Sequence, residues 1–286
     1  MTHFERLLII IAAVFAVLHA IAAAVITAGV FKTSPVICIV ATLCTLVVDF
    51  ILCVLWFNIL FIIVAFISAM LVDKKKEVTK PSKYYKFLAR SICSIILFFS
   101  NAKVEVEGIE KIPEGQRFLM VANHLSNYDP ISLIHAIGPR EVVFVSKPQN
   151  FDIHMIGRII HKAGFMAIDR DNVKNAIVTI NKAAEYIKND VTSVFIFPEG
   201  TRNRTENPLC DFRNGAFKIA LKAKCPLVIA GLVDTETVKK NAPWKRTVIK
   251  VKILETIPAE KVAEMRTNEI SDYAYKLIYD NIEHNK

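Results

Sequence analysis

A histidine and an aspartate stand five positions apart, at His124 and Asp129, in a stretch that reads N-H-L-S-N-Y-D from Asn123. The stretch follows the apolar run 118–122, which indicates a buried strand that leads into a loop. Histidine is the side chain best suited to accept a proton near neutral pH, and a neighbouring carboxylate orients its ring and stabilises its charged form. The spacing therefore predicts a general base at His124 supported by Asp129, and Asn123 is expected to position the loop by side-chain hydrogen bonds.

A second polar cluster, F-P-E-G-T-R at 197–202, follows the predicted strand 194–197. A Pro-Glu-Gly turn at a strand end lets the backbone approach a ligand closely. Arg202 carries a planar guanidinium suited to a phosphate. Glu199 is expected either to hold that arginine or to accept a hydrogen bond from a substrate hydroxyl. The alternative is a surface turn with a solvated ion pair.

The apolar residues are concentrated at the start of the chain. Of its 286 residues 53% are hydrophobic, and the mean hydropathy of +0.38 is high for a soluble domain. The run 7–31 carries no formal charge and is long enough to cross a bilayer, whereas 36–72 carries only Asp49. The second run predicts either one long tilted helix or a helix broken near Asp49. Residues 1–72 are thus expected to form a membrane-embedded helical hairpin, which either spans the bilayer or lies in one leaflet.

The positive charge lies outside this predicted anchor. The formal net charge is +9, and residues 1–72 contribute two cations against two anions, so the excess belongs to 73–286. A basic domain beside a membrane suggests anionic lipids or phosphorylated substrates, and no nucleic-acid motif appears. The lysines at 74–76 place the following domain on the cytoplasmic side by the positive-inside rule. The six cysteines have neither disulfide nor metal-ligand spacing, which favours a reducing compartment and no metal.

From residue 101 onward the chain alternates short apolar runs with helical stretches. This alternation predicts an α/β fold, in which helices flank a mostly parallel central sheet. The helix 173–187 is the clearest, with Asn172 as its N-cap. Residues 73–100 are expected to form a basic, amphipathic connecting helix, either on the membrane or in the core, before a catalytic domain at 101–286. The predicted strands are 104–107, 118–122, 142–145, 166–168, 194–197, 227–230 and 248–253.

Taken together, N-H-x4-D and F-P-E-G-T-R resemble the glycerophospholipid acyltransferases, specifically the 1-acyl-sn-glycerol-3-phosphate (lysophosphatidate) acyltransferases. The segment G-F-M-A-I-D-R at 164–170 is similar to the family's G-x-x-F-I-D-R block, and C-P-L-V at 225–228 matches its fourth block. The four blocks stand in the family's order and cover residues 100–255. One departure is Ala167, where the family usually has an aromatic residue.

The resemblance implies transfer of an acyl chain from acyl-CoA or acyl carrier protein to the sn-2 hydroxyl of lysophosphatidate. It implies no cofactor and a phospholipid membrane as the source of the acceptor. No G-x-S-x-G elbow is present, which favours direct transfer by a His124 base without an acyl-enzyme. Arg202, then Arg170, then Lys147 are the candidates for binding the phosphate, with Gly200 and Thr201 completing the substrate turn.

Two alternatives remain at this point. In the first, the acceptor is another lysophospholipid or glycerol 3-phosphate. More remotely, the chain is a non-catalytic lipid-binding protein of the membrane, although binding alone does not require a His–Asp pair.

Overall fold

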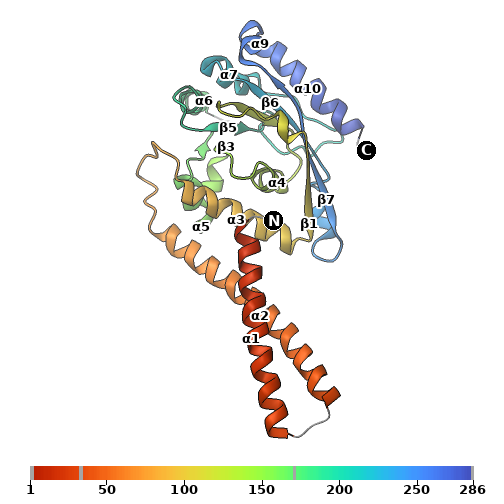
Figure 1. The fold of residues 1–286 in the computed structure, drawn as a ribbon. Coiled ribbons are helices and arrows are strands. Elements are labelled where there is room, and N and C mark those ends of the chain that lie inside the picture. The colour runs from red at the N-terminus through yellow and green to blue at the C-terminus, as the bar shows by residue number, and fades with distance from the viewer. Residues whose placement is uncertain (1–2, 32–34, 170–171, 285–286) are drawn as a thin grey trace. The chain divides into compact units, whose positions relative to one another are not determined.

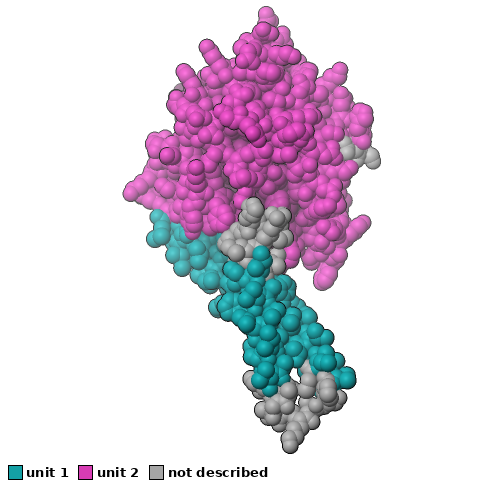
Figure 2. Space-filling model, viewed as in Figure 1, with its two compact units in different colours: residues 1–71 teal, residues 72–286 magenta. Residues whose placement is uncertain are grey.

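The computed structural model describes residues 3–31, 35–169 and 172–284. The chain divides into two compact units, unit 1 at residues 1–71 and unit 2 at residues 72–286, coloured teal and magenta in Figure 2.

Unit 1 is a pair of helices that pack against each other, α1 (His3–Phe31) and α2 (Pro35–Met70) (Figure 1). The α2 helix continues through Asp49, whose carboxylate hydrogen-bonds the ring of His19 on α1, so the expected alternative of a break near Asp49 is wrong. Within the described residues, one helix, over Ile39–Met70, is long and apolar enough to cross a membrane by length and composition. A shorter apolar segment occurs at Ala13–Val25. The long apolar helix suggests that the protein associates with a membrane.

Unit 2 is built on a seven-stranded sheet with the order β1-β7-β6-β2-β5-β3-β4. Every neighbouring pair is parallel except β6 and β7, which confirms the predicted α/β class with a mostly parallel sheet. The last strand continues beyond its predicted end, to Ile257, because residues 255–257 still pair with the start of the antiparallel neighbour β6. The strands are β1 Ala102–Glu107, β2 Leu119–Ala122, β3 Val142–Ser146, β4 Met166–Ala167, β5 Ser193–Ile196, β6 Leu227–Val233 and β7 Thr247–Ile257.

Helices cover both faces of this sheet, as Figure 1 shows. Alternate residues of the central strand β2 point to opposite faces of the sheet and pack in two separate hydrophobic cores. Leu119 and Val121 belong to the core that contains residues of α6, α7 and α10. Met120 and Ala122 join the other, with residues of α3 and α4. The helices are α3 Lys83–Phe99, α4 Tyr128–Ala136, α5 His154–Lys162, α6 Val173–Lys188, α7 Lys218–Ala223, α8 Val238–Asn241, α9 Ala259–Glu264 and α10 Thr267–Glu283, with short 3-10 turns η1 Ile109–Lys111, η2 Pro148–Phe151 and η3 Asn214–Phe217.

Two helix predictions can be followed to individual contacts. Asn172 caps α6, because its side chain accepts hydrogen bonds from the amides of Lys174 and Asn175 at 3.1 and 3.2 Å. The α3 helix packs against α4 and α5 and buries Leu88 and Leu97 among other residues, so one face of it belongs to the core of unit 2.

Candidate active site

The two predicted polar clusters lie at the same edge of the sheet. His124 follows β2 and the F-P-E-G-T-R turn follows β5, and these two strands pair in parallel. Parallel neighbours end at the same edge, where loops display polar groups. Asp129 lies in the first turn of α4, the helix that begins directly after the loop.

The imidazole of His124 and the carboxylate of Asp129 are hydrogen-bonded. Nδ1 of His124 is 2.7 Å from Oδ2 of Asp129, and the same oxygen accepts the amides of Leu125 and Ser126 at 2.6 and 2.7 Å. Oδ1 accepts the hydroxyl of Thr235. The Asp129 side chain is fully buried, whereas 16% of the His124 side chain is exposed. Because Nδ1 is engaged, Nε2 is the ring nitrogen that can take a proton from a bound substrate.

The ring of His124 stacks on Phe197. The two ring centroids are 4.1 Å apart and the planes meet at 13°. Phe197 is itself buried among the phenylalanines of the core and contacts Phe195 edge to face at 4.6 Å. A packed face on one side and a hydrogen bond at Nδ1 together restrict the orientation of the imidazole.

Glu199 is buried and ties the two clusters together. Its carboxylate accepts the amides of His124 at 2.5 Å and Cys210 at 3.1 Å. Burial raises the pKa of the Glu199 carboxyl to about 7, and hydrogen bonds from those two amides partly oppose this effect. Arg202 donates instead to the side chain of Asn127 at 2.8 Å. Glu199 therefore holds the backbone of His124 rather than the guanidinium of Arg202.

Gly200 makes the turn that follows Glu199. Its φ of +75° lies in the left-handed region, and its amide donates to the carbonyl of Phe197 at 3.1 Å. A Cβ at this position would also lie 2.7 Å from Nε of Arg213. The turn allows the next two residues, Thr201 and Arg202, to reach the cavity described below.

Asn123 clamps the end of β2 to β6. Its side chain donates to the carbonyl of Leu232 and accepts the amide of the same residue, both at 2.8 Å. The side chain is fully buried. This paired contact holds the start of the His124 loop in place.

A cavity of about 510 Å³ opens at His124. Its polar lining includes Lys147, Thr201 and Arg202 as well as the histidine, and Lys147 is exposed. The rest is lined largely by apolar side chains that come from helices α3, α4 and α5, the segment before α5 and the phenylalanines near the sheet. These residues, with Val145 of β3, are Ala89, Ile92, Cys93, Ile96, Pro130, Ile131, Ile134, Phe144, Ile153, Ile156, Ile159, Ile160, Phe165 and Phe197.

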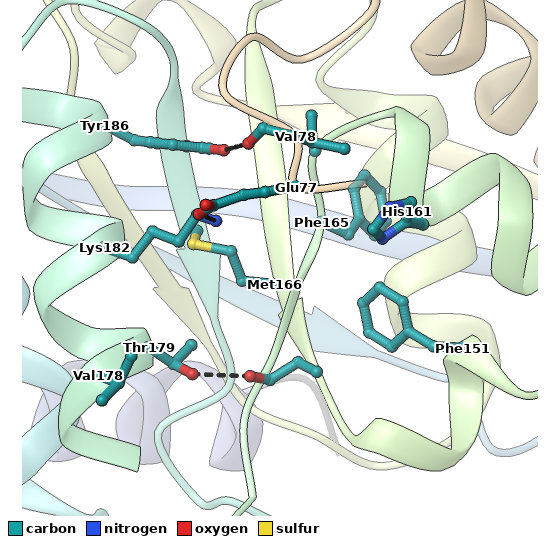
Figure 3. Close-up of a pocket in the computed structure, with 12 residues that line it drawn as sticks. Glu77, Val78, Phe151, His161, Phe165, Met166, Val178, Thr179, Lys182 and Tyr186 are labelled. Carbon is teal, nitrogen blue, oxygen red and sulfur yellow. Dashed lines mark hydrogen bonds and ion pairs between the residues drawn. The ribbon is translucent and has the colours of Figure 1, made fainter. Parts of the chain in front are cut away.

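A second, smaller cavity of about 240 Å³ shares Phe165 with the first and contains neither member of the His–Asp pair (Figure 3). Several of its polar side chains are paired: Lys182 with Glu77 at 2.7 Å, and the Tyr186 hydroxyl with the carbonyl of Val78 at 2.6 Å. Phe151 lines this second cavity, whereas Ile153 lines the larger one.

The family block at 164–170 also borders this second cavity. Gly164 has a φ of +87° and a Cβ there would lie 2.5 Å from Pro81, which accounts for a glycine at this position. Ala167, which departs from the family pattern, lines the cavity. An aromatic ring there would occupy part of that space. Arg170, the second candidate for phosphate binding, lies outside the described residues.

Thr235 is the residue of the site that the sequence patterns missed. It is fully buried and follows β6, which is parallel to β2, so it reaches Asp129 from the same edge of the sheet. The available signal was a polar segment after an apolar strand, which is too common to single out one threonine.

Of the remaining histidines, His135 contacts Ser94 and His161 contacts the carbonyl of Lys76. Within the described residues no cluster of three or more metal-ligating side chains occurs.

Comparison with known proteins shows where this arrangement has relatives. The family model described as "Acyltransferase" matches residues 103–232. The 1-acyl-sn-glycerol-3-phosphate acyltransferase of Saccharomyces cerevisiae is 27% identical over 197 residues, which cover 68% of this chain and 64% of that protein. The corresponding enzyme of Haemophilus influenzae is 28% identical over 176 residues, covering 60% of this chain and 72% of that protein.

A further relative and a solved structure agree with these matches. The probable 1-acyl-sn-glycerol-3-phosphate acyltransferase of Mycoplasma pneumoniae is 31% identical over 181 residues, covering 62% of this chain and 66% of that protein. The crystal structure of the 1-acyl-sn-glycerophosphate acyltransferase PlsC from Thermotoga maritima superposes with a TM-score of 0.56 at 20% identity. It covers 77% of this chain and 86% of its own and shows the same fold.

Proposed function

Because the chain belongs to the lysophosphatidate acyltransferase family of acyltransferases, we propose that it moves an acyl chain from a thioester to the sn-2 hydroxyl of lysophosphatidate, giving phosphatidate. The donor is acyl-CoA or acyl carrier protein. The observation that carries the proposal is the hydrogen-bonded pair of His124 and Asp129, of which His124 lines a largely apolar cavity.

In the proposed reaction, Nε2 of His124 takes the proton of the acceptor hydroxyl while the oxygen attacks the thioester carbonyl. The tetrahedral intermediate then collapses, the C–S bond breaks, and the imidazolium returns its proton to the departing thiolate. Asp129 supports this cycle because its buried carboxylate contacts Nδ1 and stabilises the imidazolium.

The cysteines support direct transfer without an acyl-enzyme. Cys93 lines the cavity, but burial raises the pKa of its thiol to about 12, so it stays protonated near neutral pH. Burial is also the main cause that raises the pKa of the Cys210 thiol, and the negative charge of the nearby Glu199 carboxylate raises it further. Neither cysteine is therefore an activated nucleophile.

The cationic side chains that line the cavity suit a phosphate. Arg202 and Lys147 both line it and carry the cations that a lysophosphatidate head group needs. Arg202 already has its guanidinium oriented by Asn127 at 2.8 Å. Arg170 remains a proposal on sequence grounds alone. The apolar part of the cavity, between α3, α4 and α5, is proposed to take an acyl chain.

Replacing His124 tests the proposal. His124→Ala is expected to lower acyl transfer by about 10²- to 10⁴-fold, the usual contribution of a positioned base. His154→Ala is the matched control, since His154 is exposed on α5 and does not line the cavity. Both variants are assayed with radiolabelled acyl donors, and their melting temperatures check the fold. Full activity in His124→Ala would exclude the base assignment.

The same assay separates the alternatives. Lysophosphatidate, lysophosphatidylcholine and glycerol 3-phosphate are offered in turn with acyl-CoA and with acyl carrier protein. The proposal expects the highest kcat/KM with lysophosphatidate. A preference for another acceptor keeps the enzyme class and changes the substrate, whereas lipid binding without turnover on any pair would favour the non-catalytic alternative.

A further inference from the structure

One tryptophan stands fully in solvent on unit 2. Trp244 is 92% exposed, the highest value among the exposed large hydrophobic side chains of the described residues. It lies in the segment 242–246 between α8 and β7, in the sequence A-P-W-K-R. An indole ring left in water forgoes the burial that such a large apolar surface favours, and exposed apolar residues that gather in a patch mark interaction sites.

The segment that carries Trp244 is held firmly. The amide of Lys245 donates to the carbonyl of Asn241 at 2.8 Å, and the side chain of Asn241 donates to the hydroxyl of Thr247 at 2.9 Å. Val238, at the start of α8, is fully buried and ties the segment to the core. The tryptophan is thus presented on an ordered turn.

Two more aromatic residues lie at the same edge of the sheet. Phe98 and Phe99, at the end of α3, are 73% and 53% exposed, and their rings meet edge to face at 5.4 Å. They precede β1, while Trp244 precedes β7, and these strands pair in parallel with Ala102 opposite Thr247. Figure 1 shows α3 leading into β1 beside the start of β7.

Positive charge is concentrated in the segment that carries Trp244. The segment 238–246 reads V-K-K-N-A-P-W-K-R and has four cations and no carboxylate. All four are exposed, and none forms an ion pair within the part of the chain that the structure describes. On the neighbouring strand β1, Glu105 pairs with Lys103 at 2.6 Å. Lys103 lowers the pKa of the Glu105 carboxyl most, and the charges of Lys250 and Arg246 lower it further. We call Phe98, Phe99, Lys239, Lys240, Trp244, Lys245 and Arg246 the aromatic-basic surface.

We propose that the aromatic-basic surface docks unit 2 on an anionic phospholipid surface, as a membrane contact separate from the apolar helix α2. Tryptophan and phenylalanine insert at the level of the lipid head groups, and lysine and arginine beside them bind anionic lipids. A nucleic acid would also match this charge, but the long apolar helix already brings the chain to a bilayer, which favours a lipid surface. This inference does not depend on acyl transfer, because its readout is the environment of one indole ring.

The chain is suited to a fluorescence test because it contains only two tryptophans, Trp56 in α2 and Trp244. In the full-length Trp56→Phe variant, all tryptophan emission reports on Trp244. The protein is inserted into vesicles of phosphatidylcholine alone or mixed with phosphatidylglycerol. Emission wavelength, acrylamide quenching and quenching by lipids brominated near the head group are then measured.

In anionic vesicles the emission is expected to shift to the blue, acrylamide quenching to fall and lipid quenching to appear. Salt at 1 M, where the Debye length is about 3 Å, should weaken all three effects. Replacing Lys239, Lys240, Lys245 and Arg246 by glutamine should also remove most of the lipid quenching. The matched control makes the same change in charge at four exposed lysines on other elements, Lys218, Lys224, Lys261 and Lys276, and should leave the quenching unchanged.

Two outcomes would overturn the proposal. Emission typical of an indole in water, with full access to acrylamide in both vesicles, would show that the surface stays off the lipid. A blue shift without quenching by brominated lipids would assign the surface to a protein contact instead.

Discussion

At the scale of residues, the proposed base depends on how a buried carboxylate is satisfied. Asp129 is fully buried, and such a charge is costly unless donors surround it. Two backbone amides, the imidazole of His124 and the hydroxyl of Thr235 supply them. The orientation of His124 therefore rests on residues beyond the His–Asp pair.

Thr235→Val tests this dependence, because valine keeps the shape and removes the hydroxyl. Losing one hydrogen bond to a buried charge costs about 1–3 kcal/mol. If that whole cost raises the activation barrier, because His124 is less well oriented, kcat should fall by roughly 5- to 150-fold. Thr235→Ser should retain most of the activity. A lower melting temperature with an unchanged kcat per folded molecule would show that Thr235 stabilises the fold without positioning the site.

Glu199 predicts a dependence of stability on pH. Its pKa is raised by burial from 4.5 to about 7 in the folded protein, so the folded state holds this proton more tightly than the unfolded state does. The contribution to stability is complete below about pH 4.5 and is lost as pH rises through 7, with a limit on the order of 3 kcal/mol.

Glu199→Gln removes this titration, so the melting temperature of the wild type relative to this variant should fall between pH 5 and pH 8. Differential scanning fluorimetry in detergent measures both proteins side by side. A difference that stays constant across this range would contradict the raised pKa.

At the scale of elements, the sheet brings the loops together and the helices enclose the space beside them. Strands β5 and β6 flank β2 and run parallel to it, so the segments after all three strands lie at the edge of the sheet that carries His124. Helices α3, α4 and α5 then provide isoleucines that line the cavity from three directions. An α3 that lay only on a membrane would leave this cavity without one wall.

The wall formed by α3 predicts a change in chain-length preference. Ile96→Trp adds a bulky ring to a cavity of about 510 Å³ and should shift the preference toward shorter acyl donors. Val173→Trp is the control, because Val173 is 71% exposed on α6 and lines neither cavity. Competition among donors of different lengths gives the ratio of kcat/KM values. An unchanged ratio would place the acyl chain elsewhere.

At the scale of the whole molecule, apolar surface and positive charge belong to different units. Unit 1 contains the long apolar helix, and the charge excess lies in residues 73–286. The lysines at 74–76 directly follow α2, and we propose that they keep unit 2 on the cytoplasmic side of the membrane.

Labelling of a single introduced cysteine tests this sidedness. Lys276→Cys places an exposed thiol on α10, and Cys210→Ser removes the partly exposed native thiol of unit 2. A membrane-impermeant maleimide should label intact cells only after permeabilisation. Labelling of intact cells would place unit 2 on the outside.

The amino-acid sequence by itself determined the class of fold and the main reactive groups. Apolar runs of strand length alternate with helical periodicity after residue 101, and burial of such runs favours a parallel sheet between helices. His124 and Asp129 are close in sequence, so a short loop followed by a helix start brings them into contact. The N-cap at Asn172 was predictable for the same reason, since its partners are local.

Only the tertiary structure decided the contacts between distant segments. Thr235 reaches Asp129 and Glu199 reaches the amide of His124 because strand order, which periodicity does not encode, places β5 and β6 beside β2. Asp49, within the continuous α2, likewise has its partner on another helix, His19 of α1. Local patterns record which groups a segment carries, whereas long-range pairing settles which of those groups face one another.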